Sequence, residues 1–242
     1  MSFAPTNTRI LIAVATTVVA AFAVLGRVWS GVPGPDFALW ILLCVLGEAL
    51  WVRVPVGNAT LSMAITANFA AMLLLPAGHA LAAIAVATVI AEATLMRKSP
   101  LRFMFNASQS MLAAAAGIVV IELLGGVAFE ARAFGAAQVL ACLAGAIAYT
   151  LVNTFAVSVM IGLEQRMSPF TAWRANFANA YEVVSNGALF ALGVVLALLI
   201  RMIGPAAVVL VGLPVVLAWL SYRHVLKASA ASDDEYDERD AA

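Results

Sequence analysis

The fold is decided by an uncharged stretch that reads FGAAQVLACLAGAIAYTLVNTFAVSVMIGL from Phe134 to Leu163. A helix that crosses a bilayer needs roughly 20 mainly apolar residues, and this stretch exceeds that length. The rest of the chain has the same character, because 64% of its 242 residues are hydrophobic and only 11% are charged. Soluble domains carry about 25% charged residues. The sequence therefore predicts a polytopic membrane protein and excludes an ordinary soluble domain and a disordered one.

Seven further apolar runs lie on both sides of this stretch. They are separated by turn-forming Gly and Pro residues, as at Ser99-Pro100, Ser168-Pro169 and Gly204-Pro205, because Gly permits positive φ and Pro ends helices. We expect an all-α bundle over residues 1–228 and an acidic, disordered tail over residues 229–242. The eight predicted spans are Ile10–Leu25, Phe37–Val52, Leu61–Pro76, Ala80–Met96, Phe105–Leu124, Phe134–Leu163, Ala180–Met202 and Pro205–Val225. A short interfacial helix is predicted over Pro169–Phe177.

The distribution of Lys and Arg predicts the orientation, since cytoplasmic loops carry an excess of both. With eight spans and a cytoplasmic N-terminus, ten basic residues fall inside and three outside. The inner ones are Arg9, Arg53, Arg97, Lys98, Arg102, Arg166, Arg174, Arg223, Lys227 and Arg239, and the outer ones are Arg27, Arg132 and Arg201. We expect both termini in the cytoplasm and the protein in the cytoplasmic (inner) membrane. Six spans satisfy the same rule if two short segments are re-entrant.

The first segment has a second interpretation. Arg9 precedes an apolar run that contains Ala21-Phe22-Ala23, which fits the cleavage pattern of a signal peptide. Because the apolar run continues through Leu25, we favour an uncleaved helix.

Several function classes are excluded by what the chain lacks. The formal net charge is zero, whereas nucleic-acid binding needs clustered Lys and Arg. Cys44 and Cys142 stand alone, and His79 and His224 are too isolated for a zinc site. No Ser/His/Asp arrangement, HExxH, P-loop or GxSxG motif occurs. We expect no enzymatic activity, no metal and no cofactor; haem is disfavoured because no His lies well inside a span.

Acidic residues within apolar segments are costly and usually face a bundle interior or a wet cavity. The four that qualify are Glu48, Glu92, Glu122 and Glu182. Glu122 lies near the outer end of its span and is expected to reach water. Glu48 and Glu92 lie near the cytoplasmic ends of theirs, where Arg53 or Arg97 can pair with them. A ligand-binding or proton-transfer role is the alternative to this structural ion pair.

Other polar residues recur at helical spacing and form a polar stripe on each of five helices. They are Ser62 and Thr66; Thr88 and Glu92; Asn106, Gln109 and Ser110; Thr150, Asn153, Thr154 and Ser158; and Asn176, Asn179, Glu182 and Asn186. Such stripes can be interhelical hydrogen-bond contacts, worth about 0.6 kcal/mol each. Alternatively they converge on a polar cavity that suits a neutral or cationic ligand. The hypothetical ligand-binding residues are Glu48, Glu92, Asn106, Gln109, Asn153, Asn179, Glu182 and Asn186.

Several short motifs resemble a known family. They include Gly47-Glu48, Val54-Pro55-Val56-Gly57-Asn58, Arg97-Lys98-Ser99-Pro100, Phe105-Asn106 with Gln109, Val152-Asn153-Thr154, and Ser168-Pro169 before Ala172-Trp173-Arg174-Ala175-Asn176-Phe177. Over residues 37–226 the chain resembles the polytopic N-terminal module of bacterial HD-GYP and GGDEF signalling proteins. The stretch from Pro55 to Ala91 is also similar, to a lesser degree, to substrate-binding subunits of energy-coupling-factor transporters. The first resemblance implies a sensing or ligand-binding bundle; since no output enzyme follows here, we expect signalling through a partner.

Three functions follow as hypotheses. The first is a non-enzymatic, sensor-like or accessory membrane module that binds a small polar ligand or a partner membrane protein. The second is a substrate-binding component of a membrane transporter, which requires a pathway near the bilayer midplane. The third is a structural subunit of a larger membrane complex. Membrane lipids and a membrane protein partner or a second copy are the expected partners.

Overall fold

The computed structural model describes residues 8–53, 60–126, 134–221 and 224, so the predicted acidic tail lies outside the described residues. The elements are α1 (Thr8–Val28), α2 (Asp36–Ala49), β1 (Trp51–Arg53), β2 (Thr60–Ser62), α3 (Ala64–Leu74), α4 (Ala77–Ile90), the π-helix η1 (Ala91–Leu95), α5 (Pro100–Leu123), α6 (Ala136–Gln165), α7 (Pro169–Asn176), α8 (Ala180–Ile203) and the 3-10 turn η2 (Gly204–Ala206). Residues 207–221 form a last helix. The prediction of a helical protein is confirmed, and each predicted span contains a helix.

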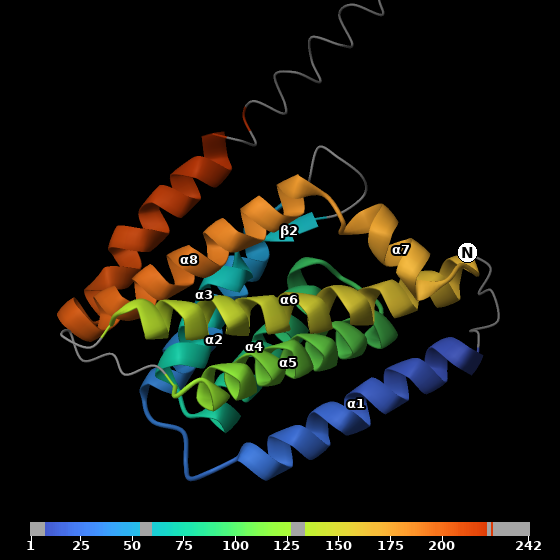
Figure 1. The fold of residues 1–242 in the computed structure, drawn as a ribbon, viewed down its shortest axis with the longest axis horizontal. Helices are drawn as coiled ribbons and strands as arrows, with labels where there is room; N and C mark the ends of the chain where they lie inside the picture. Colours follow the sequence, from blue (N-terminus) through green and yellow to red (C-terminus); the bar gives the residue numbers. More distant parts are fainter. Residues whose placement is uncertain (1–7, 54–59, 127–133, 222–223, 225–242) are drawn as a thin grey trace, which may run out of the picture.

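Five helices of the described chain are long and apolar enough to cross a membrane, with α8 and the last helix taken together as one of them. Gly204, at a φ of 72°, and Pro205 separate these two helices, and Figure 1 shows the last helix turning back beside α8. Two of the three shortest predicted spans, the second and the third, form helices of 14 residues in α2 and 11 residues in α3. At 1.5 Å per residue these measure about 21 and 16 Å, less than the roughly 30 Å of a hydrocarbon core.

A small antiparallel hairpin corrects the predicted ends of the second and third spans. Trp51 pairs with Ser62 and Val52 with Leu61, so the observed helices α2 and α3 leave out these four residues, which the predicted spans included. β-branched residues favour extended backbone, and Pro55 disfavours helix in the residue before it. The fold is therefore helical apart from this hairpin.

The two Ser-Pro turn signals lie at the starts of helices. Pro100 and Pro169 stand in the first turns of α5 and α7, where a missing N–H costs nothing. Ser168 Oγ also accepts a hydrogen bond from the Thr171 backbone N–H at 3.0 Å. The predicted helix at Pro169–Phe177 is thus confirmed as α7.

The helices run between two ends of the bundle (Figure 1). One end holds the hairpin, α7 and the start of α8, and is called the hairpin end below. At the other end, a shared pocket brings together Asp36, Leu75 and Gly204, so this is called the Gly204 end. Successive long helices alternate between the two ends.

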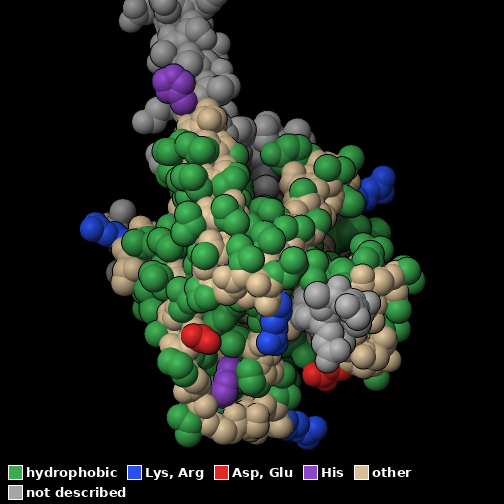
Figure 2. Space-filling view, turned by 90° about the vertical axis from the view of Figure 1, so that its left-hand side faces the viewer, with side chains coloured by type: hydrophobic (Ala, Val, Ile, Leu, Met, Phe, Trp, Pro, Cys, Tyr) green, Lys and Arg blue, Asp and Glu red, His purple; other side chains and the backbone are tan. Residues whose placement is uncertain are grey.

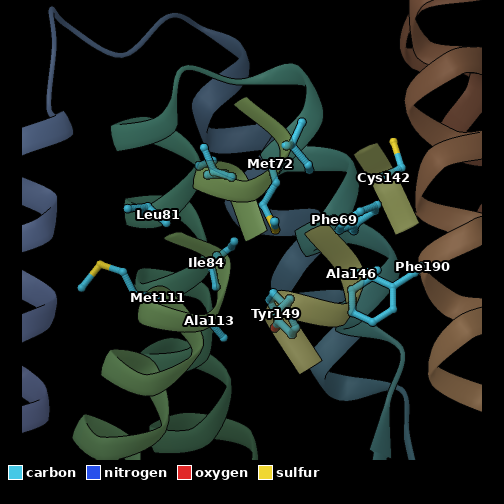
Figure 3. Packing of buried hydrophobic residues seen from close by; sticks show 14 of the residues in the cluster. Phe69, Met72, Leu81, Ile84, Met111, Ala113, Cys142, Ala146, Tyr149 and Phe190 are labelled. Atoms are coloured by element: carbon cyan, nitrogen blue, oxygen red, sulfur yellow. The ribbon is translucent and has the colours of Figure 1, made fainter. Parts of the chain in front are cut away.

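The most extensive helix packing is between α5 and α6, followed by α3 with α8 and α4 with α5. Phe69, Leu81 and Ile84 are almost fully buried, and Figure 3 shows these side chains meeting across the helices. A Cβ on either Gly117 or Gly145 would lie 3.1 Å from the carbonyl oxygen of the other. Small residues let membrane helices approach closely enough for dispersion contacts to hold them together.

The outer surface is apolar, as hydrocarbon requires. Leu140 on α6 and Val209 on the last helix are exposed by more than half. Figure 2 views the molecule from the Gly204 end and shows many hydrophobic side chains with several charged groups between them.

Candidate functional site

A polar cavity of about 680 Å³ opens among the helices toward the hairpin end. Its walls come from the end of α2, the hairpin, α3, α4 with η1, α5, α6, α7 and α8. Ligand pockets commonly have volumes of 300–1,000 Å³. The polar and charged lining residues are Glu48, Ser62, Asn68, Thr88, Glu92, Lys98, Asn106, Gln109, Ser110, Tyr149, Asn153, Thr154, Asn176, Glu182 and Asn186.

Glu92 is the most heavily bonded acid of the cavity. It lies on the π-helix η1 with only 5% of its surface exposed. Lys98 Nζ donates to Glu92 Oε1, and Asn106 Nδ2 lies 2.8 Å from both carboxylate oxygens. The backbone bond from Lys98 N to Glu92 O folds the following loop back over the acid. A predicted ion pair is therefore present, but its cation is Lys98 and not Arg97, because only Lys98 is turned back by this bond.

Glu48 joins the cavity where α2 meets the hairpin. Its Oε2 accepts a hydrogen bond from Ser62 Oγ at 3.0 Å. Gly47 allows the approach, since a Cβ there would lie 2.6 Å from Ala64 Cα. The side chain of Arg53, the other predicted partner, lies outside the described residues.

Glu182 enters the cavity from the first turn of α8. Asn186 Nδ2 donates to its Oε2 at 2.9 Å, and a helix N-terminus favours negative charge. Asn179 is the N-cap, and its Oδ1 accepts from Glu182 N at 2.9 Å. Asn179 does not line the cavity, which corrects its predicted place among the ligand-binding residues: the cap bond turns its side chain back onto the helix.

Two buried carbonyl oxygens of the cavity wall have no hydrogen-bond donor. They are Asn68 Oδ1 and Gln109 Oε1, on residues exposed by 4% and 6%. Gln109 Nε2 donates to Ser110 Oγ at 3.2 Å, so only its oxygen is left over. Burying an unsatisfied polar atom costs about 1–3 kcal/mol, and a donor group placed in the cavity would remove that penalty.

The α7 helix closes the cavity against α6. Trp173 Nε1 donates to Thr154 Oγ1 at 3.0 Å. Thr154 and Ser158 donate to the backbone of their own helix at 2.8 and 2.7 Å, so the α6 stripe is largely intrahelical bonding. Thr66 behaves differently and donates to Leu189 O on α8 at 3.1 Å, an interhelical contact of the predicted kind.

The structure thus brings seven of the eight predicted residues to one cavity. Glu122 is exposed at the opposite end of α5, as predicted. Sequence analysis missed Asn68, Lys98 and Tyr149 as lining residues. An isolated Asn inside the apolar run of α3 was the available signal for Asn68, whereas nothing local distinguishes Tyr149 from a packing residue.

The charges of the lining residues favour a donor-rich guest. Three carboxylates, Glu48, Glu92 and Glu182, face one lysine, Lys98, among the described lining residues. No group of three His, Cys, Asp or Glu side chains in the described part of the chain could hold a metal ion.

The comparisons with known proteins agree with a membrane module. A family model, MASE9, which describes a membrane-associated sensor domain family, matches residues 36–225. No curated protein and no solved structure matches the chain. The more specific likenesses to modules of HD-GYP and GGDEF proteins and to energy-coupling-factor subunits stay predictions.

Proposed function

Because the chain belongs to the MASE9 family of membrane-associated sensor domains, we propose that its polar cavity binds a small cationic or neutral ligand that donates hydrogen bonds. The main support for this proposal is the side-chain oxygen of Gln109, which is buried in the cavity wall and accepts no hydrogen bond. A ligand N–H or O–H supplies that donor and relieves the desolvation penalty.

The excess of carboxylates sets the preferred charge of the ligand. Glu92 already accepts hydrogen bonds from Lys98 and Asn106. Among the described residues, Glu48 and Glu182 each accept one side-chain hydrogen bond, from Ser62 and Asn186 respectively. An ammonium group that reaches either of the latter two acids would gain charge-assisted hydrogen bonds. A carboxylate ligand would meet repulsion from the same groups.

The proposal also includes the orientation of the protein in the membrane. Arg97, Lys98, Arg102, Arg166 and Arg174 lie on segments of the hairpin end, and Arg27 and Arg201 on segments of the Gly204 end. The positive-inside rule then gives an even number of spans in an inner membrane, eight or, with α2 and α3 re-entrant, six, with both termini in the cytoplasm and the cavity in the cytoplasmic half. Single cysteines at Ser168 and Val32 test this: a membrane-impermeant maleimide added to intact cells labels only Val32→Cys, and the reverse result contradicts it.

The module itself is non-enzymatic in this proposal and passes its ligand state to a membrane protein partner or a second copy. Mild detergent extraction followed by native mass spectrometry tests this part. A complex is expected, and a solitary monomer under the mildest conditions counts against it.

The ligand proposal is tested with the full chain in lipid nanodiscs and three small probes. Propylamine is cationic, glycerol is neutral and propionate is anionic. We expect propylamine and glycerol to raise the melting temperature, because they bind the folded state alone, and propionate to leave it unchanged.

The variant Gln109→Met makes this test specific. It removes the orphaned oxygen with little change in volume, so the ligand-free protein should melt at a higher temperature while the propylamine shift is lost. Glu122→Gln, on the same helix but exposed at the other end, should change neither value. A propylamine shift that survives in Gln109→Met would refute the assignment.

A further inference from the structure

A second, wholly apolar groove of about 250 Å³ lies between α6 and α8, nearer the Gly204 end. Phe69, Cys142, Ala146, Phe190 and Val194 are among its walls, and no polar side chain is among its described lining residues. Gly187 leaves it open, since a Cβ there would have no neighbour within 4 Å.

The groove lies beside the polar cavity on the same helices, and no described residue lines both. On α3, Asn68 lines the cavity and Phe69 the groove; on α8, Asn186 lines the cavity and Gly187 the groove. On α6, Tyr149 lines the cavity and Ala146, one turn away, the groove. On each of these three helices a residue of the polar cavity is therefore a near neighbour of a residue of the apolar groove.

An aromatic pair marks this boundary. The rings of Tyr149 and Phe190 lie 5.4 Å apart, and Phe69 and Phe190 lie 4.9 Å apart. Figure 3 shows Tyr149 and Phe190 beside Ala146, where α6 faces α8. Apart from this level α6 and α8 touch little, whereas α6 packs closely along α5.

From this adjacency we infer that the ligand is amphipathic, with a donor-bearing head in the polar cavity and an alkyl chain in the α6–α8 groove. This inference rests on the proposed function and adds the chain. Such a molecule dissolves in the membrane and enters sideways between α6 and α8. The helix rise of 1.5 Å per residue gives the groove a length of roughly 10 Å from Gly187 to Val194, which suits a chain of medium length.

The test measures equilibrium binding of propylamine, decylamine and decanoate to the full chain in nanodiscs, with empty discs subtracted. Wild-type protein should bind both amines, decylamine more tightly, and should not bind decanoate saturably. Each methylene group that the protein removes from water is worth about a fourfold gain in affinity.

Gly187→Leu fills the groove without touching the cavity. We expect about a tenfold loss of affinity for decylamine and no change for propylamine. Gly212→Leu is the matched control: its Cβ also has open space on the last helix, and it should change neither affinity. An unchanged decylamine affinity in Gly187→Leu means that bulk lipid fills the groove, and equal losses for both amines mean that the chain lies elsewhere; either result overturns the inference.

Chain-end labelling locates the alkyl chain directly. Decylamine with a diazirine at its chain end should label α6 between Val139 and Ala146 and α8 between Gly187 and Val194. Labelling confined to residues 207–221 overturns the inference. Propylamine binding that persists in these cases leaves the proposed function intact, whereas failure of both amines to bind the wild type overturns both proposals.

Discussion

Helices α5 and α6 are in close backbone contact along one half of their length and stand apart around a polar cavity along the other half. Toward the Gly204 end, Gly117 and Gly145 bring the backbones into contact. Toward the hairpin end, Asn106 and Gln109 on α5 and Asn153 on α6 stand around a cavity. The close half fixes the spacing and angle of the helices, so the polar half does not have to collapse. A membrane bundle can thus keep an open polar site only where another stretch of the same helices is tightly packed.

The largest loss of stability is expected from a substitution in the closely packed half of the α5–α6 pair. Gly145→Val would place a Cβ 2.5 Å from Ile121 Cγ1 and 3.1 Å from Gly117 O, and such overpacking costs about 3 kcal/mol. Thermal unfolding in detergent should show a much lower melting temperature. Gly212→Val, with open space around its Cβ, is the control. Equal melting temperatures for the two variants would show that the close contact does not hold the pair.

A smaller effect is expected at the charged wall of the polar half. Lys98→Met leaves the Glu92 carboxylate, exposed by 6%, with Asn106 as its remaining side-chain donor. Loss of one partner of a fully buried pair costs 3–5 kcal/mol, but Lys98 is one-third exposed, so solvent reduces the cost to about 2 kcal/mol. Glu92→Gln in the Lys98→Met background should recover part of the loss in a double-mutant cycle. Additive losses would argue against the pair.

The smallest effect is expected at Asn179, where substitutions distinguish a helix-capping role from a ligand-binding role. Asn179→Ala removes the bond to Glu182 N and should cost about 1 kcal/mol of stability. Asn179→Ser keeps a capping oxygen and should retain most of it. Neither variant should change propylamine affinity by more than twofold, because Asn179 does not line the cavity. A large loss of propylamine affinity in both variants would show that Asn179 does contact the ligand.

Local sequence rules predicted individual helices better than their ends. The Ser-Pro and Gly-Pro signals gave the starts of α5 and α7 and the end of α8. The hairpin was missed because Trp51–Arg53 and Thr60–Ser62 continue apolar runs, and only their pairing distinguishes them from helix ends. The partner of Glu92 was misassigned for a similar reason: Arg97 and Lys98 are equivalent in sequence, and the fold of the loop selects Lys98.

The sequence by itself determined three things: that the chain is a membrane protein, which segments form helices, and which polar residues must face away from lipid. It could do so because hydrophobicity, turn chemistry and helical period are all local properties. It also placed most of the cavity's side chains on the correct helix faces. Only the tertiary structure decided that these faces meet at one end of the bundle, that Asn179 points back to its helix, and that an apolar groove lies beside the polar cavity. Those outcomes depend on contacts between residues far apart in the chain, such as Gly117 with Gly145 and Tyr149 with Phe190, and no local pattern specifies which distant helix a given face will meet.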